Sequence, residues 1–275
     1  MKSKKILIAG PWVGEFGWEL FAWQGYIRSL SEHFEETIII CRPSSQPLYR
    51  DFAHSFIDSA PTIGQPDSYF MYNLDINKHL MEVLRSHKNL LNNNSTMITP
   101  RRIGTPPWTH YLETISFGNY KIQPKYRSYG KKVKPIVDYV FHLRSRNLRE
   151  EDNWSHSNWE RLLQLLTHAG KRVGCIGTSD SSGHIEGSID FRDAPLSKVF
   201  DILKNAECTF GSSSGPMHLA SLCESPHVVW SIPKNYVRYT QNWNPLSTPV
   251  LFLSDQGWHP TADYIYEKFI NWGDK

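Results

Sequence analysis

The same order of elements, an apolar strand followed by an amphipathic helix and a second apolar strand, is predicted in two separate parts of this chain. In the first part, residues 4–10 and 36–43 are apolar runs of strand length that stop at proline. The segment between them has apolar residues at the three- and four-residue spacing of one helix face: Leu20, Trp23, Ile27 and Leu30. Two parallel strands need a crossover of this kind, so the pattern predicts an α/β fold.

The pattern starts again after a basic segment at residues 121–134. Residues 136–145 are predicted to be a strand, and the helix that follows can be capped by Ser157 and ended by Gly170. One face of that helix is apolar: Trp159, Leu162, Leu163 and Leu166. Further strands and helices are predicted to alternate up to the end of the chain. In the first part of the chain, residues 47–58 are also predicted to be a helix. The sequence therefore predicts two α/β domains joined near the basic segment.

We expect a first domain over residues 1–125 and a second over residues 135–258. The helix predicted within residues 259–275 is expected to pack back on the first domain. No apolar run approaches the roughly 20 residues that span a bilayer. The apolar run near the N-terminus is too short for a signal-peptide core, so a cytoplasmic location is expected. The cysteines are not spaced as zinc ligands, and we expect buried, reduced thiols at Cys41, Cys175, Cys208 and Cys223.

Basic residues are concentrated in one segment although the formal net charge is only +3. Residues 121–134 carry six basic residues and no acidic one. Such a segment is either a solvated linker or a surface for an anionic ligand. Together with Arg101 and Arg102 it keeps DNA open as a partner, because phosphate contacts use Lys and Arg.

A serine-rich turn at residues 211–216 lies between a predicted strand and a predicted helix. The first amides of a helix have no intrahelical acceptor, and the helix dipole adds partial positive charge there. Gly215 would let a ligand approach closely, and Pro216 is suited to a first helical turn. The turn is therefore a candidate phosphate site. The alternative is an ordinary crossover turn with no ligand.

Residues 214–220, Ser-Gly-Pro-Met-His-Leu-Ala, resemble the signature of the heptosyltransferase-like glycosyltransferases, and Pro226 matches a later proline of that signature. Ser213 stands where that family usually has Asp. The resemblance implies a glycosyltransferase B fold, which is α/β with two Rossmann-like domains facing a central cleft. It also implies that this segment binds the diphosphate of a nucleotide sugar. The donor-binding residues expected on this basis are Ser212, Ser213, Ser214, Gly215, Pro216, Met217 and His218.

Two arginines lie at the end of the strand predicted at residues 136–145: Arg144 is within it and Arg146 directly follows it. Arg144 and Arg146 would point to the same side if the strand continues. Arginine suits bidentate phosphate contacts, and the carboxyl end of a strand is where ligands bind in open α/β sheets. His142 and Arg144 also resemble the strand end of fucosyltransferase-type folds, where an arginine meets the donor phosphate. We expect both arginines in the donor site; the alternative for Arg144 is a salt bridge with Glu150 or Glu151.

The loop after the first strand holds two carboxylates, Glu15 and Glu19. In the resembled enzymes an acidic residue in a Gly-Asp motif of this loop is the base that deprotonates the acceptor. Gly14 and Glu15 match that motif by type, with Glu19 as the competing base. Glu15 could instead only complement the helix N-terminus. Gly14 and two nearby tryptophans, Trp12 and Trp18, are expected on the acceptor side, and Trp23 in the core.

The resemblance implies a glycosyltransferase that uses a nucleotide-diphospho-sugar, inverts the configuration and needs neither a metal nor a cofactor. The acceptor stays open between a glycan, a small molecule and a modified base in DNA. Two other functions fit the same two-domain frame. A nucleotide-sugar epimerase would turn over the donor without an acceptor. A noncatalytic module would bind glycan or nucleotide and form no product.

Overall fold

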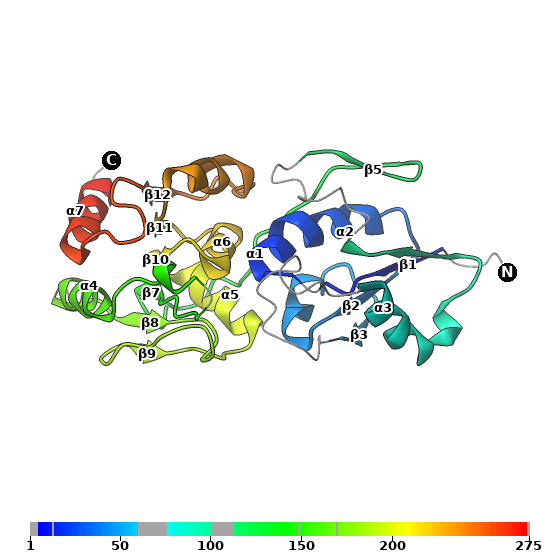
Figure 1. The fold of residues 1–275 in the computed structure, drawn as a ribbon, viewed down its shortest axis with the longest axis horizontal. Helices are drawn as coiled ribbons and strands as arrows, with labels where there is room; N and C mark the ends of the chain where they lie inside the picture. Colours follow the sequence, from blue (N-terminus) through cyan, green and yellow to red (C-terminus); the bar gives the residue numbers. More distant parts are fainter. Residues whose placement is uncertain are drawn as a thin grey trace. The chain divides into compact units, whose positions relative to one another are not determined.

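The structure, a computed structural model, describes residues 5–12, 14–59, 76–100, 113–147, 149–168 and 170–273. The chain divides into two compact units, Met1–Tyr126 and Arg127–Lys275. Each unit is built on its own parallel sheet (Figure 1). The boundary between the units lies inside the basic segment. Each unit is α/β, as the alternation of strands and helices predicts.

The N-terminal unit contains a four-stranded parallel sheet in the order β3-β2-β1-β4. Its strands are β1 (Ile6–Ala9), β2 (Glu36–Cys41), β3 (Ser55–Asp58) and β4 (Ser95–Ile98). Ile8 in the central strand lies opposite Ile38 on one side and Met97 on the other. Because the strands are short and apolar, their side chains form a core with Leu84 of α3 (Ile76–Arg85). A separate hairpin pairs β5 (Ile115–Phe117) with β6 (Tyr120–Ile122).

One continuous helical stretch connects β1 to β2. It consists of α1 (Phe16–Trp18), the π-helical η1 (Glu19–Trp23) and α2 (Gln24–Ser31). The predicted apolar face is confirmed, since these side chains are buried: Leu20, Trp23, Ile27 and Leu30. The Gln24 amide donates to the Leu20 carbonyl and the Tyr126 hydroxyl to the Phe21 carbonyl, at 3.0 and 2.6 Å. The side chains of Gln24 and Tyr126 thus bond carbonyls of the π-helical turn. Single π-helical turns are frequent at functional sites.

The helix predicted over residues 47–58 is wrong. This part of the chain contains the end of the 3₁₀ helix η2 (Pro43–Leu48) and then strand β3. β3 pairs with β2 in parallel, with Phe56 opposite Ile39. The hydrogen bonds between β3 and β2 stabilise the strand conformation of residues 55–58, which the local sequence pattern does not predict. Another 3₁₀ helix, η3 (Lys88–Leu90), follows α3.

The C-terminal unit contains a six-stranded parallel sheet in the order β12-β11-β10-β7-β8-β9. The strands are β7 (Tyr139–His142), β8 (Val173–Cys175), β9 (Ile189–Asp190), β10 (Cys208–Ser212), β11 (His227–Trp230) and β12 (Val250–Leu253). The helices are α4 (His156–His168), α5 (Leu196–Asn205), α6 (Gly215–Leu222) and α7 (Ala262–Gly273). Short helical turns complete the unit: η5 (Glu150–Asp152), η6 (Pro233–Asn235) and η7 (Arg238–Asn242).

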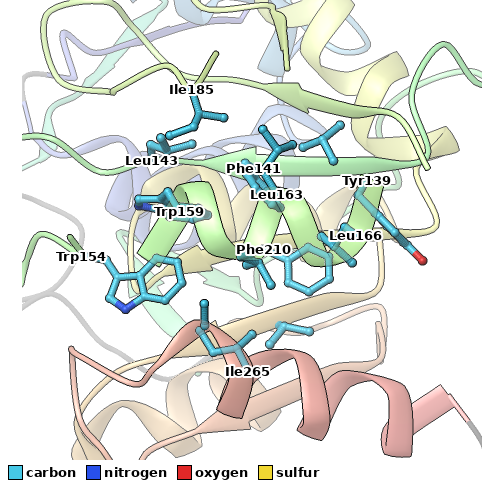
Figure 2. Packing of buried hydrophobic residues seen from close by; sticks show 14 of the residues in the cluster. Tyr139, Phe141, Leu143, Trp154, Trp159, Leu163, Leu166, Ile185, Phe210 and Ile265 are labelled. Carbon is cyan, nitrogen blue, oxygen red and sulfur yellow. The ribbon is translucent and has the colours of Figure 1, made fainter. Parts of the chain in front are cut away.

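Both faces of this sheet are covered. Successive residues of a strand point to opposite faces of the sheet. In β11, Val228 packs with apolar residues of α4 and α7, whereas its neighbour Val229 packs with Met217 and Tyr239. Helices α4 and α7 thus lie on one face, and α6 lies on the other (Figure 1). Figure 2 shows the hydrophobic core between the sheet and helices α4 and α7. Its aromatic centre consists of Trp154, Trp159 and Trp230, with ring centroids 4.7 to 5.4 Å apart.

The two helices on that face differ in how well the sequence predicted them. The apolar face of α4 is confirmed, but Ser157 lies inside the helix and the Ser155 hydroxyl accepts the Asn158 amide at 3.3 Å. Helix α7, which we expected to return to the first domain, packs in the C-terminal unit. Ile265 enters the core of that unit (Figure 2). Asp263 pairs with Arg161 of α4 at 2.6 Å.

The four cysteines are buried and free, as predicted: Cys41, Cys175, Cys208 and Cys223. Burial raises the pKa of each of these thiols, so all four stay protonated and unreactive at neutral pH. Among the residues that the structure describes, no helix is long and apolar enough to cross a membrane.

Candidate functional site

The serine loop, residues 212–216, joins the carboxyl end of β10 to the first turn of α6. Strands β7 and β11 flank β10, so the segments that follow all three strands lie at the same edge of the sheet. This edge is where open α/β sheets bind their ligands. The loop is therefore in the strand-turn-helix setting that the sequence predicts.

Ser214 is the N-cap residue of α6, but its side chain makes no capping hydrogen bond. Its hydroxyl instead lies 2.9 Å from Nδ1 of His142 at the end of β7. Amides in the first turn of a helix have no intrahelical acceptor. With the Ser214 hydroxyl turned away, the first turn of α6 can donate to an anion, and the helix dipole favours negative charge there.

His142 connects the serine loop to the loop that follows β8. Its Nε2 lies 3.1 Å from the Ser182 hydroxyl, while its Nδ1 meets Ser214. Gly177 makes this packing possible: its φ is +130°, and a Cβ there would lie 2.1 Å from the Ser182 hydroxyl. Sequence reasoning noted His142 only beside Arg144. Its link to two serines, 40 and 72 residues away, has no local signal.

Burial, together with the nearby positive charges of Arg144 and Arg146, lowers the pKa of His142 to about 3. The imidazole is therefore neutral at pH 7, with one nitrogen donating a hydrogen bond and the other accepting one. The ring therefore holds Ser214 and Ser182 by hydrogen bonds and adds no charge of its own to the serine loop.

Tyr239, from η7, bonds the other side of the serine loop. Its hydroxyl accepts the Ser214 amide at 3.1 Å and donates to the Ser213 hydroxyl at 3.1 Å. The His218 ring stacks on the Tyr239 ring with centroids 4.1 Å apart. Burial raises the pKa of Tyr239 to about 12, so the phenol keeps its proton. Sequence reasoning missed this residue, because η7 begins 22 residues after Pro216 and carries no motif.

Three buried histidines of this unit make its stability depend on pH. Burial lowers the pKa of His142 to about 3 and that of His227 to about 4, and places the pKa of His218 well below its ordinary value of 6.5. Below pH 6.5 the unfolded chain binds protons that the folded chain does not. The free energy of unfolding should therefore decrease as the pH is lowered below 6.5, by up to about 1.4 kcal/mol per pH unit for each histidine. Urea unfolding at pH 7, 6 and 5 measures the slope.

His142→Gln should reduce that slope by the contribution of one histidine. A slope that is the same in His142→Gln and in the parent protein would contradict the prediction.

Arg144 is engaged within its own unit. It is buried, donates to the Arg149 carbonyl at 3.0 Å and to Asn153, and lies 4.0 Å from Asp152. Asp152 is thus an acidic neighbour of Arg144. These contacts show that Arg144 holds residues 149–153, and its contact with the donor phosphate stays a prediction. The backbone of Arg146 is held by the same Asn153 side chain.

The predicted donor residues divide by burial. Ser213, Ser214, Gly215 and Pro216 are partly exposed at the edge of the sheet. Ser212, Met217 and His218 are buried. The Met217 side chain packs under Gly211, where a Cβ would lie 2.6 Å from its sulfur. A ligand at this edge can therefore contact the first group directly, while the buried group supports the loop.

The N-terminal unit places the two predicted bases differently. Glu15 is half-buried at the N-cap of α1, in extended conformation. Glu19 is fully buried, and its carboxylate accepts hydrogen bonds from Arg42, Ser45 and Tyr49. A carboxylate enclosed in this way cannot reach an acceptor hydroxyl. Of the two carboxylates, only that of Glu15 is partly exposed, and its role as the base stays a prediction.

The two tryptophans of this loop also differ. Trp12 is only 2% exposed, and its ring lies 5.9 Å from that of Trp23. Trp12 is therefore a core residue and not the acceptor contact that we expected, whereas Trp23 is in the core as predicted. Trp18 is half-buried and stays a candidate for the acceptor side. Gly14 is buried directly before Glu15.

Some basic side chains of this segment form contacts within their own unit. Lys125 pairs with Glu32 at 2.5 Å, and Nζ of Lys132 donates to the Lys204 carbonyl at 3.3 Å. Arg101 and Arg102 lie outside the described residues. Within the described part of the chain, no three His, Cys, Asp or Glu side chains are grouped as metal ligands.

Solved structures of glycosyltransferases share this architecture over nearly the whole chain. A glycosyl transferase family 9 protein from Veillonella parvula matches with a TM-score of 0.62 at 10% identity, covering 98% of both chains. E. coli heptosyltransferase WaaC with ADP matches with a TM-score of 0.62 at 11% identity, covering 97% of this chain and 98% of that one. The chain has the glycosyltransferase B fold.

A further match is E. coli ADP-heptose lps heptosyltransferase II, with a TM-score of 0.56 at 12% identity, covering 97% of this chain and 98% of that one. No family model matches the sequence, and no curated protein matches it significantly. At 10–12% identity, the structural matches establish the fold and do not by themselves assign an activity.

Proposed function

We propose that this protein is a glycosyltransferase that moves a sugar from a nucleotide-diphospho-sugar to an acceptor hydroxyl. One observation carries the proposal: the N-cap hydroxyl of α6 is turned to His142, so the first helical turn is left to bind an anion. This turn lies at the ligand-binding edge of the sheet. Structures with the same fold include one named as a heptosyltransferase with ADP, which supports a diphosphate donor.

The proposed reaction is a single displacement that inverts the configuration at the sugar. Glu15 takes the proton of the acceptor hydroxyl, and the hydroxyl oxygen forms a bond to the anomeric carbon. The bond from that carbon to the diphosphate oxygen breaks, and the nucleoside diphosphate leaves with the electron pair. The first turn of α6 stabilises the negative charge on the leaving diphosphate. The chemistry assigned here to the chain's own side chains requires neither a metal nor a cofactor.

The proposal is tested by calorimetric titration with nucleoside diphosphates and the matching monophosphates. Because the proposed contact is to the diphosphate, at least one diphosphate should bind more tightly than its monophosphate by about tenfold or more, or about 1.4 kcal/mol. Absence of nucleotide binding by the folded protein would overturn the proposal. Turnover of a bound nucleotide sugar to an isomer, with no nucleotide released, would instead identify an epimerase.

A further inference from the structure

A buried carboxylate lies one helical turn after the proposed base. Glu19 is fully buried, and its Oε1 accepts a hydrogen bond from the Tyr49 hydroxyl at 2.8 Å. Its Oε2 accepts from the Ser45 hydroxyl at 3.0 Å and pairs with Nη2 of Arg42 at 3.0 Å. Burial raises the pKa of Tyr49 well above its ordinary value, and the charge of Glu19 adds to the effect. Tyr49 therefore stays a proton donor to Glu19.

The same guanidinium reaches the residue before the proposed base. Arg42 directly follows β2, and its Nη2 also donates to the Gly14 carbonyl at 3.4 Å. The next carbonyl, that of Glu15, accepts from the Glu19 amide at 3.1 Å and from Nε1 of Trp12 at 3.3 Å. Hydrogen bonds thus hold two successive carbonyls: Arg42 holds that of Gly14, and the Glu19 amide and the Trp12 indole hold that of Glu15.

The packing leaves this turn little room to shift. A Cβ on Gly14 would lie 2.8 Å from the Trp12 ring, so the backbone rests directly on the indole. Glu15 has φ −60° and ψ 146°, the extended conformation of an N-cap residue. Because side chains adopt staggered rotamers set by the backbone, a fixed backbone at Glu15 limits the directions in which its carboxylate can point.

We infer that Arg42, itself held by Glu19, is a positioning residue for Glu15. The inference rests on the proposed function, because it concerns the residue that takes the acceptor proton there. A base must lie within hydrogen-bond reach of the proton that it removes. A misplacement of about 1 Å can lower a rate by about 10². Arg42 is placed to prevent such a shift by tying the turn to the end of the neighbouring strand.

The test is a double-mutant cycle on acceptor-dependent turnover. Arg42→Met should lower kcat by about 10- to 100-fold and leave the dissociation constant of the nucleotide diphosphate unchanged. In the Glu15→Gln background the same substitution should cause no further loss, because there is no base left to misplace. Arg42→Lys should recover part of the rate, since an ammonium can still pair with Glu19. A loss that is equally large in both backgrounds, or none in either, would overturn the inference.

Two controls keep the cycle interpretable. Arg42→Met leaves the buried Glu19 without its cation, so the variant Arg42→Met/Glu19→Gln removes both charges and should fold while showing the same fall in kcat. Full activity in that folded variant would also overturn the inference. Arg50→Met removes an exposed arginine of the same unit and should change nothing. If Glu15→Gln alone keeps full turnover, the base assignment itself fails, and the inference fails with it.

Discussion

Glu15→Gln is expected to lower acceptor-dependent turnover by about 10²–10⁴, the usual contribution of a general base. Glutamine keeps the size of the side chain and can form hydrogen bonds, but it cannot take the acceptor proton. The affinity for nucleoside diphosphate should stay unchanged, because the proposed diphosphate contacts belong to the other unit. Steady-state rates with a nucleotide sugar and acceptor, together with calorimetric titration of the diphosphate, measure both quantities.

Glu19→Gln is the matched comparison, since it makes the same chemical change one helical turn away. Here the expected result is a loss of stability, with a fall in kcat no larger than that of Arg42→Met, because Arg42 would lose its buried anionic partner. An inactive but folded Glu19→Gln beside an active Glu15→Gln would reverse the assignment. If both variants kept full activity, this turn would hold no base and the proposed mechanism would be wrong.

Gly215→Val is expected to raise the dissociation constant of nucleoside diphosphate by at least about tenfold, equivalent to about 1.4 kcal/mol. Gly215 begins α6 and is partly exposed beside the proposed phosphate contacts. A branched side chain there would keep the phosphate away from the helix amides. Its backbone φ is not positive, unlike that of Gly177, so the substitution does not force a strained backbone. Calorimetric titration measures the change.

Gly215→Ala serves as the graded control and should weaken binding less than valine does. The melting temperature of each variant without ligand shows whether the fold is intact. Unchanged affinity in a folded Gly215→Val protein would place the diphosphate away from the serine loop.

Much of the local structure could be predicted because it depends on neighbouring residues. The apolar face of the first helix appears as the spacing of Leu20, Trp23 and Ile27, and these side chains are buried. The serine loop was found in the same way, from a strand, small residues and Pro216 at a helix start. Strand β3 was missed, since an edge strand of four residues is set by its pairing with β2.

The amino-acid sequence by itself determined the two α/β units, the serine loop at a helix N-terminus and the position of two carboxylates in one turn. Only the tertiary structure decided which groups meet there. It brought His142 and Tyr239 to the serine loop from 72 and 25 residues away. It also enclosed Glu19 with Arg42 and left Glu15 partly exposed. The physical reason is that periodicity records local geometry, whereas parallel strands far apart in the chain meet at one sheet edge.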